Sequence, residues 1–537
     1  MNTPSLDRLA WALVAALALL GLFLVADYGL SWDEPQQRLI GKVAFNHVSQ
    51  TLFPGWIAPF PDVQPLHHFR DRDYGVVFEL PAVVLERLFR LTDTREIYFM
   101  RHYLTFLVFL AGVMAMYRLG RMHCNSAMAG LLAASMLLLS PRFFAEAFYN
   151  SKDVVFMALF AIAMATLFRL LRGPTVRNAL IHALATALAV DVRIMGLLLA
   201  ATTLSAISLL IIRGFLAWPQ GLKITAIYVL SSCLLIILMF PFLWADPWGN
   251  LLIAFANMSQ FGRWGGDVLY FGQLISGENL PWHYAPVWIS ITTPPIILAL
   301  LVVGVFATVT RLLRNKLRLW EKPFELEALI ALGLLTAPIA AVIALESVLY
   351  NGWRQLYFVY PALLLLATRG AYDIYQWLSR HPALRYGFAA VLISAAIVTG
   401  QWMVRAHPMQ NVYFNSLVGD QHKTQFELDY WGLANREALE FLLDYQPSGP
   451  IPVRAKSFTP LEFTALILRP PERDRLDFDV DHDHPRYLIN NYYGWQRHGN
   501  LLELPDGYLR IHDIVVTGEI ILSIYEWQGN DDNTDTQ

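Results

Sequence analysis

Apolar blocks, each near the length of a membrane-spanning helix, recur through residues 1–403. A helix needs about 20 apolar residues to cross a bilayer. The blocks fall near residues 9–27, 97–118, 125–141, 153–171, 177–191, 194–212, 223–243, 286–310, 325–346, 354–369 and 385–403. Some are short, and the pair 177–191 and 194–212 fits either a helical hairpin or one broken helix. The pattern predicts an α-helical polytopic membrane protein with about eleven transmembrane helices.

After residue 403 the apolar blocks stop, and the sequence becomes that of an ordinary soluble protein. Periodicity predicts helices over 434–444 and 460–467, strands over 451–456 and 486–490, and a hairpin of 511–517 with 519–527 that turns near Thr517-Gly518. The tail 530–537 is polar and unpatterned, so we expect it to be disordered. Residues 404–537 are therefore predicted to form a soluble α/β domain that follows a transmembrane module of residues 1–403.

Basic residues fall in alternate short loops, and this fixes the expected orientation. Lys and Arg are enriched in the cytoplasmic loops of membrane proteins. The loops so marked contain Arg118, Arg121, Arg172, Arg177, Arg213, Lys223, the run 311–322, Arg369, Arg380 and Arg385. We therefore expect a multi-pass protein of the plasma (inner) membrane, with its N-terminus in the cytoplasm and residues 404–537 outside. The first outer loop spans about residues 28–96, and its segment 75–90 has the period of a helix lying along the membrane surface.

Composition agrees with a membrane protein and excludes several other classes. Of the 537 residues, 56% are hydrophobic and 15% are charged, whereas soluble proteins carry about 25% charged residues. The net charge of −3 gives no basic surface for nucleic acid. Two cysteines, Cys124 and Cys233, do not make a disulfide framework. The first block lacks a small-residue cleavage site, so we interpret it as a retained span.

Acidic residues stand out where the chain leaves the membrane on its outer side. Asp33 and Glu34, in the stretch SWDEPQQ, directly follow the first block. A second acid, Asp153, follows Lys152 in the stretch NSKD at the outer end of another block. A single such pair is most simply explained as interface polarity. The recurrence of an acid in a matching position favours a functional site instead.

Two arginines depart from the positive-inside pattern. Arg193 and Arg354 lie at outer ends of apolar blocks, where basic residues are disfavoured. Two interpretations are open for each. A structural one is a salt bridge with Asp191 or with another outer acid. A functional one is an anionic ligand at the membrane surface, such as a lipid phosphate.

These motifs together resemble the GT-C glycosyltransferases, and within them the protein O-mannosyltransferase and lipid A aminoarabinose transferase group. The resemblance rests on Asp33-Glu34, on the NSKD motif with Asp153, and on Arg354 with Tyr357 and Pro361. It covers about residues 5–403 in topology. The chain departs from the pattern at residues 67–81, where a His-Pro-Pro type stretch is usual, and this leaves the acceptor class open. The WWDYG signature of oligosaccharyltransferases is absent, and DYWG at 429–432 does not replace it.

The resemblance implies an inverting enzyme that moves a hexosyl or pentosyl group from a polyprenyl-phosphate-sugar to an acceptor hydroxyl outside the cytoplasm. The acceptor is a protein, a lipid or a glycan. Such chemistry needs one carboxylate as base and fixed cations for the leaving phosphate. By resemblance, Asp33 is the base, and Glu34 and Asp153 orient the acceptor or bind a divalent cation. Lys152, Arg193, Arg354 and Tyr357 would hold the phosphate.

Other candidates are weaker. His67 and His68 could join Glu79 in a metal site, although interface histidines explain them as well. A transporter would also carry intramembrane charges, but it should show repeated halves and charges near the midplane. A polysaccharide ligase or polymerase would share the donor, but it should not need an acidic pair after the first span.

Overall fold

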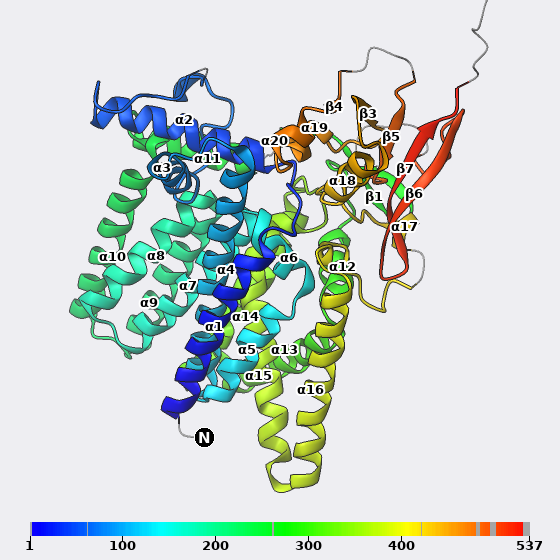
Figure 1. The fold of residues 1–537 in the computed structure, drawn as a ribbon. Helices are drawn as coiled ribbons and strands as arrows, with labels where there is room; N and C mark the ends of the chain where they lie inside the picture. The colour runs from blue at the N-terminus through cyan, green and yellow to red at the C-terminus, as the bar shows by residue number, and fades with distance from the viewer. Residues whose placement is uncertain are drawn as a thin grey trace, which may run out of the picture.

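The computed structural model describes residues 3–529, except for 62, 260–262, 420–421, 480–483 and 495–500. A bundle of helices leads from the N-terminus at one end to the C-terminal region, residues 404–537, at the other (Figure 1). The predicted disordered tail, residues 530–537, lies outside the described residues.

Each of the eleven apolar blocks contains a helix. The bundle helices are α1 (Thr3–Leu24), α4 (Thr94–Cys124), α5 (Ala127–Leu138), α6 (Pro141–Tyr149), α7 (Asp153–Arg172), α8 (Val176–Val192), α9 (Leu197–Ile212), α10 (Trp218–Met239), α13 (Pro295–Asn315), α14 (Pro323–Ala344), α15 (Tyr360–Trp377) and α16 (Pro382–Arg405). The predicted polytopic α-helical fold is confirmed. Within the described residues, eight helices are long and apolar enough to span a membrane, and α5 with α6 adds a ninth if that bent pair is one span.

Two blocks and one pair of blocks differ from a simple span. The block 125–141 is bent by 68° between α5 and α6, where Pro141 cannot continue the helix of the preceding turn. The block 286–310 is broken at Pro294, so that α12 (Tyr284–Thr292) precedes the span α13. The pair 177–191 and 194–212 forms two helices, α8 and α9, joined by a short 3-10 turn at Ile194–Gly196.

The loops predicted to lie outside hold more regular structure than the sequence predicted. The first contains α2 (Glu34–Leu52), which was not predicted, and α3 (Glu79–Leu88), which lies within the predicted segment 75–90. The loop after α10 contains α11 (Pro247–Ser259) and an antiparallel hairpin of β1 (Asp267–Tyr270) with β2 (Gln273–Ser276). Helices α2, α3 and α11 lie on the same end of the bundle as the C-terminal region (Figure 1).

The C-terminal region folds as a small α/β unit. Its helices are α17 (His422–Gln425), α18 (Asn435–Tyr445), α19 (Leu461–Ala465) and α20 (Pro470–Arg473). Its strands are β3 (Ile451–Ala455), β4 (Leu476–Asp477), β5 (Tyr487–Asn490), β6 (Tyr508–Val516) and β7 (Glu519–Trp527), in the order β4-β3-β5-β7-β6. The hairpin turns at Thr517 and Gly518, both with positive φ, as a tight β-hairpin turn requires. Six of these elements were predicted, namely α18, α19, β3, β5, β6 and β7, and the short elements α17, α20 and β4 were not.

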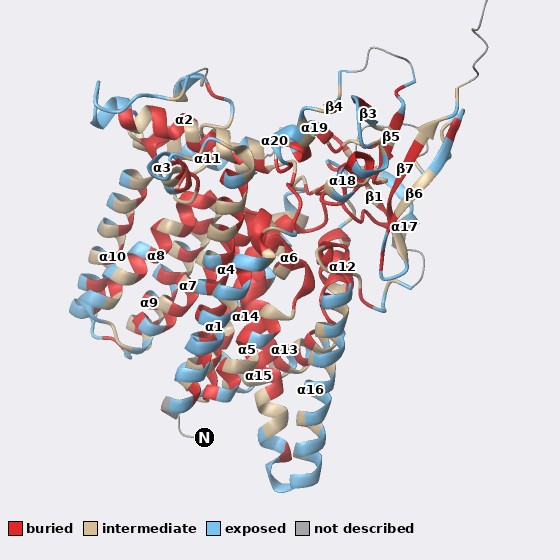
Figure 2. Ribbon diagram, viewed as in Figure 1, coloured by how far each residue is buried: buried red, intermediate tan, exposed pale blue. Residues whose placement is uncertain are grey.

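Helix α7, which begins at the last residue of the NSKD motif, packs closely against α4 at the centre of the bundle. Figure 2 shows buried residues concentrated along α4, α7 and α15, with exposed residues along α16. Gly112 of α4 faces Ala158 of α7, where a Cβ would approach the Ala158 Cβ to 2.8 Å. Small residues of this kind let transmembrane helices approach closely. Asp153, at the start of α7, therefore lies on a rigid element.

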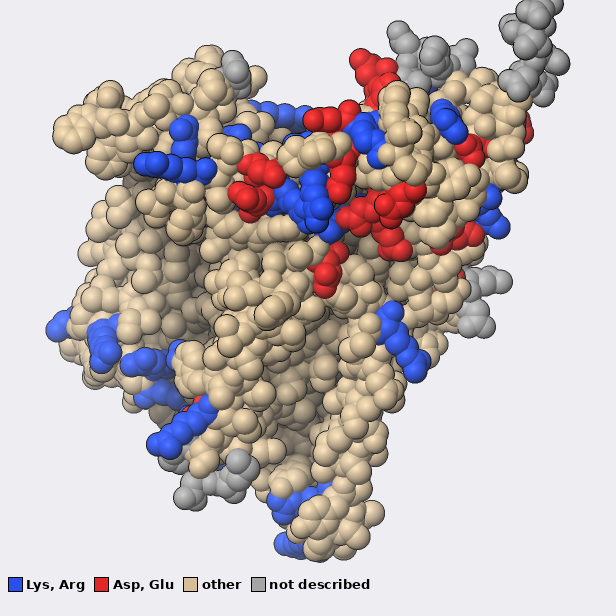
Figure 3. Space-filling view, in the orientation of Figure 1, with Lys and Arg blue, Asp and Glu red and all other residues tan. Residues whose placement is uncertain are grey.

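Fusion to a reporter enzyme that is active only outside the cytoplasm tests the predicted orientation. Figure 3 shows Lys and Arg with few acids at the N-terminal end of the bundle, and charges of both signs at the other end. By the positive-inside rule, a fusion after Arg405 should be active and one after Arg318 inactive. The opposite pattern would put all the predicted site residues on the cytoplasmic side.

Candidate active site

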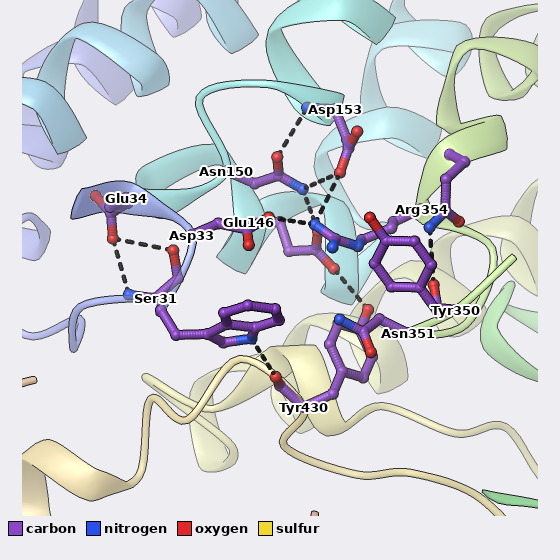
Figure 4. A network of polar contacts seen from close by, with 12 residues as sticks. Ser31, Asp33, Glu34, Glu146, Asn150, Asp153, Tyr350, Asn351, Arg354 and Tyr430 are labelled. Carbon is purple, nitrogen blue, oxygen red and sulfur yellow. Dashed lines mark hydrogen bonds and ion pairs between the residues drawn. The ribbon is translucent and has the colours of Figure 1, made fainter. Parts of the chain in front are cut away.

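Four charged side chains from distant parts of the chain meet at the end of the bundle that carries the C-terminal region. Arg354 Nη1 donates to Asp33 Oδ2 at 2.6 Å and lies 3.5 Å from Asp153 Oδ2. Arg193 Nη2 forms an ion pair with Asp153 Oδ1. Asp33, Asp153 and Arg354 converge in Figure 4. These residues, Asp33, Asp153, Arg193 and Arg354, are the charged cluster below.

Ends of helices place each member of the charged cluster. Asp33 is the N-cap of α2, which has Pro35 in its first turn, a position that proline favours. Asp153 begins α7, and its backbone N–H donates to Asn150 Oδ1 at 2.8 Å. Arg193 follows the last residue of α8, and Arg354 begins a 3-10 helix that leads into α15. The backbone positions of all four residues are therefore set by the ends of regular elements.

The first outer loop is fastened to the end of α8, next to Arg193. Asp191 Oδ1 accepts a hydrogen bond from Val77 N at 2.6 Å. Gly75 passes so close that a Cβ would collide with the Asp191 carbonyl oxygen, so only glycine fits there. The salt bridge considered between Arg193 and Asp191 does not form. Arg193 pairs with Asp153 instead, and Arg354 pairs with Asp33. Each arginine therefore forms a salt bridge with an acid other than Asp191.

The two acids of the charged cluster differ in access. The Asp153 side chain is 0% exposed, and its two oxygens contact Arg193, Arg354 and Asn150. The Asp33 side chain is 24% exposed, and its Oδ1 accepts no hydrogen bond from the described residues. Only Asp33 therefore offers a carboxylate oxygen to an incoming group.

The cluster also keeps spare hydrogen-bond donors. Within the described part of the chain, the buried Nε atoms of Arg193 and Arg354 have no partner. A buried donor without a partner costs about 1–3 kcal/mol. A ligand that accepts hydrogen bonds would remove that cost, and an anion would do so most strongly.

Lys152 lies beside the cluster, over an aromatic ring. Its Nζ is 3.6 Å from the centre of the Tyr74 ring. Burial, together with the nearby charge of Arg193, lowers the pKa of Lys152 to about 7, because burial disfavours the charged ammonium. An arriving anion would favour the protonated form of this lysine.

Glu34 and Tyr357 do not join the charged cluster. Glu34 turns away from Asp33, accepting hydrogen bonds from Ser31 N at 2.8 Å and pairing with His102 Nε2 at 2.9 Å; Figure 4 shows its contact with Ser31. The Tyr357 hydroxyl donates to Glu146 Oε1 at 2.7 Å. Both side chains have internal partners that explain their presence.

The predicted metal candidates do not assemble. Glu79 is buried, where it forms an ion pair with Arg101 and accepts a hydrogen bond from Ser151 Oγ at 2.7 Å. His67 and His68 are exposed, with their rings 4.1 Å apart. Among the described residues, no three His, Cys, Asp or Glu side chains are grouped as a metal site requires. We therefore derive no step through a divalent cation.

Sequence analysis missed several side chains that surround the cluster. Arg354 lies between two rings, 4.9 Å from the centre of Tyr350 and 4.6 Å from that of Trp431. Glu146, on α6, accepts hydrogen bonds from Asn150 and Tyr357. An acid inside the otherwise apolar stretch PRFFAEAFY was the available signal for Glu146. Trp431 belongs to the DYWG stretch that had been set aside.

No protein-family model and no curated protein sequence matches the chain. Solved structures similar to it include the following two. ArnT from Cupriavidus metallidurans has a TM-score of 0.47 and 14% identity, covering 90% of this chain and 93% of its own. The Archaeoglobus fulgidus oligosaccharyltransferase, solved with Zn and sulfate, has a TM-score of 0.46 and 14% identity. This match covers 81% of this chain and 56% of the archaeal one.

Both structures are GT-C glycosyltransferases, the class that the sequence motifs resemble. Similarity at this level carries no information about the substrate. The chemistry of this chain has to be inferred from its own side chains.

Proposed function

We propose that the chain is an inverting glycosyltransferase that moves a sugar from a polyprenyl-phosphate donor to an acceptor hydroxyl at the outer face of the membrane. The observation that carries the proposal is the charged cluster: two fixed arginines beside one accessible carboxylate, at the outer end of the bundle. A transporter is less well supported, because these charges lie at helix ends on one side rather than along a path through the bundle.

The cluster suits a phosphate that gains charge during the reaction. The two carboxylates and two guanidinium groups balance, and Lys152 adds a further cation when protonated. Arg193 Nε and Arg354 Nε are available donors, and guanidinium groups match phosphate oxygens with paired hydrogen bonds. A donor phosphate held here would lie at the membrane boundary, as a phosphate attached to a polyprenyl chain in the bilayer requires.

The proposed reaction is one displacement at the anomeric carbon. The acceptor oxygen attacks C1 of the sugar, its proton passes to Asp33, and the bond between C1 and the phosphate oxygen breaks. The leaving polyprenyl phosphate keeps the electron pair, and Arg354, Arg193 and Lys152 stabilise its charge. Because phosphate is already a good leaving group, no second carboxylate is needed as general acid, in contrast to a glycosidase.

In this scheme the Asp33–Arg354 ion pair describes the enzyme before the donor binds. The phosphate would compete with Asp33 for the Arg354 guanidinium, and the carboxylate would then be free to accept a proton. Donor binding would in this way prepare the base. Glu34 supports the turn that carries Asp33 through Ser31, and Asp153 holds Arg193 and Arg354 in place.

Asp153→Asn tests this positioning role. The substitution removes the charge shared by two arginines, so the donor KM should rise about tenfold or more while the protein still folds. Asp373→Asn is a matched control, because Asp373 pairs with Arg311 at 2.6 Å and Arg369 at 2.8 Å at the other end of the bundle. Steady-state kinetics of both variants check the prediction. Equal effects of the two substitutions would contradict a role for Asp153 in donor binding.

The direct test of the function is transfer by purified protein. Radiolabelled polyprenyl-phosphate sugars are incubated with the protein and a membrane extract, and label is followed into protein, lipid and glycan fractions. We expect label to leave the donor and to enter one fraction with inversion at C1. Donors that remain intact in the presence of every fraction would overturn the proposal. Label that crosses vesicle membranes unchanged would support a transporter instead.

A further inference from the structure

One segment of the C-terminal region, Asp429–Leu433, reaches into the charged cluster. The Trp431 ring lies over the Arg354 guanidinium at 4.6 Å, and Tyr350 lies 4.9 Å from the same group. Trp431 is almost fully buried. A desolvated cation between two aromatic rings is among the stronger forms of cation–π contact.

The same segment holds the residue next to Asp33. Trp32 Nε1 donates to the Tyr430 carbonyl at 3.0 Å, and Trp32 N donates to the Trp431 carbonyl at 3.4 Å. A Cβ at Gly29 would meet the Leu433 carbonyl oxygen at 2.5 Å. The segment therefore touches both partners of the Asp33–Arg354 pair, one through a ring and the other through the backbone beside it.

The segment is anchored on the C-terminal side as well. Asp429 Oδ2 accepts from Ala434 N at 2.9 Å, and Asp429 Oδ1 accepts from Asn411 Nδ2 at 3.1 Å. Asn491, which follows β5, donates to the Asp429 carbonyl at 2.9 Å. Tyr430 donates across to Glu146 of α6 at 3.3 Å. Figure 4 shows Tyr430 entering the network from a different part of the chain than Glu146 and Arg354.

Contacts with neighbouring aromatic rings hold the Trp431 side chain in place. Its indole N–H is buried and donates to no group among the described residues. Its ring contacts Tyr149, with centroids 5.8 Å apart, and Tyr430 at 5.4 Å. We therefore infer that Trp431 acts through the contact between its ring and the Arg354 guanidinium.

We propose that Trp431 is a positioning residue that holds the Arg354 guanidinium in place beside Asp33, where it can receive the donor phosphate, so that the C-terminal region completes the active site. The kinetic consequence of this inference rests on the proposed glycosyl transfer. The contact between Trp431 and Arg354 does not depend on that reaction. It assigns the C-terminal region a part in donor binding, beyond resting on the membrane module.

Fluorination of the ring separates an electrostatic role from a space-filling one. Mono-, di-, tri- and tetrafluorotryptophan, placed at position 431 of the full-length protein by nonsense suppression, weaken the attraction for a cation stepwise with little change in size. We expect log kcat/KM for the donor to fall in proportion, by about tenfold over the series, mainly through KM. The same series at Trp377, 79% exposed at the far end of α15, should leave the kinetics unchanged.

A double-mutant cycle gives a readout that does not depend on activity. The melting temperatures of Trp431→Leu, Arg354→Met and the double variant should be non-additive, the second substitution costing less once the first is made. Additive changes in melting temperature would overturn the inference. So would an unchanged kcat/KM across the fluorinated series if Trp431→Leu inactivates the enzyme. A wild-type protein inert toward every lipid-linked sugar would overturn the proposed function alone, and the cycle would still decide the contact.

Discussion

Asp33→Asn should lower the rate of sugar transfer by at least about a hundredfold without weakening the binding of the donor. The substitution keeps the size of the side chain and its capacity for hydrogen bonds, but it removes the basicity that the acceptor proton requires. A general base contributes about 10²–10⁴-fold. The expected effect falls on kcat because proton acceptance matters only in the transition state. Single-turnover rates and donor binding, measured separately, check the prediction.

Glu34→Gln is the matched control, since it changes the neighbouring acid in the same way. Glu34 contacts Ser31 and His102 rather than Arg354, so its loss should affect stability more than turnover. Normal turnover in Asp33→Asn with loss in Glu34→Gln would exchange the two roles. Normal turnover in both variants would remove the main support for a glycosyltransferase.

Much of the fold was predictable because lipid imposes a simple constraint. Blocks such as 97–118 and 325–346 need only to be apolar and long enough, and α4 and α14 cover them. The alternation of the hairpin 511–517 with 519–527 is equally direct, and β6 and β7 form it. Breaks within helices were harder to predict. A proline such as Pro294 marks a possible break, but the tertiary structure determines whether the helix ends there.

The candidate site was predictable in its residue types but not in its pairs. Arg193 and Arg354 stood out because charge is disfavoured at those positions. That Arg354 meets Asp33, 321 positions away in the sequence, requires the fold to bring the start of α2 to the 3-10 helix that precedes α15, which no local pattern specifies. Asp33 and Glu34 are adjacent acids that the sequence alone does not distinguish. Their side chains point in different directions because Asp33 is the N-cap of α2 and Glu34 is its first residue.

The DYWG stretch illustrates the same limit. Compared with a family signature, residues 429–432 offered no match. In the structure, Tyr430 and Trp431 contact Glu146 and Arg354. Such contacts arise from the way the C-terminal region seats on the bundle, and a motif comparison cannot register them.

Arg354→Ala should raise the donor KM and lower kcat together, so that kcat/KM falls by about 10²–10³-fold. Arg354 is the cation closest to Asp33, and its loss removes charge stabilisation from the leaving phosphate. Arg193→Ala should weaken donor use less, since Arg193, among the described residues, pairs only with Asp153. Arg354→Lys should restore part of the activity, because a lysine supplies the charge without the paired hydrogen bonds of a guanidinium.

Folding has to be separated from chemistry in these variants, since removing one partner of a buried ion pair costs about 3–5 kcal/mol. Arg369→Ala is a suitable control, because Arg369 is also buried and paired, with Asp373 at 2.8 Å, but lies midway along α15. If Arg369→Ala lowers the melting temperature as much as Arg354→Ala does and keeps its turnover, the loss in Arg354→Ala belongs to the site. Normal donor use by both Arg354→Ala and Arg193→Ala would show that the two arginines serve only as salt-bridge partners for Asp33 and Asp153. The phosphate would then have to bind elsewhere.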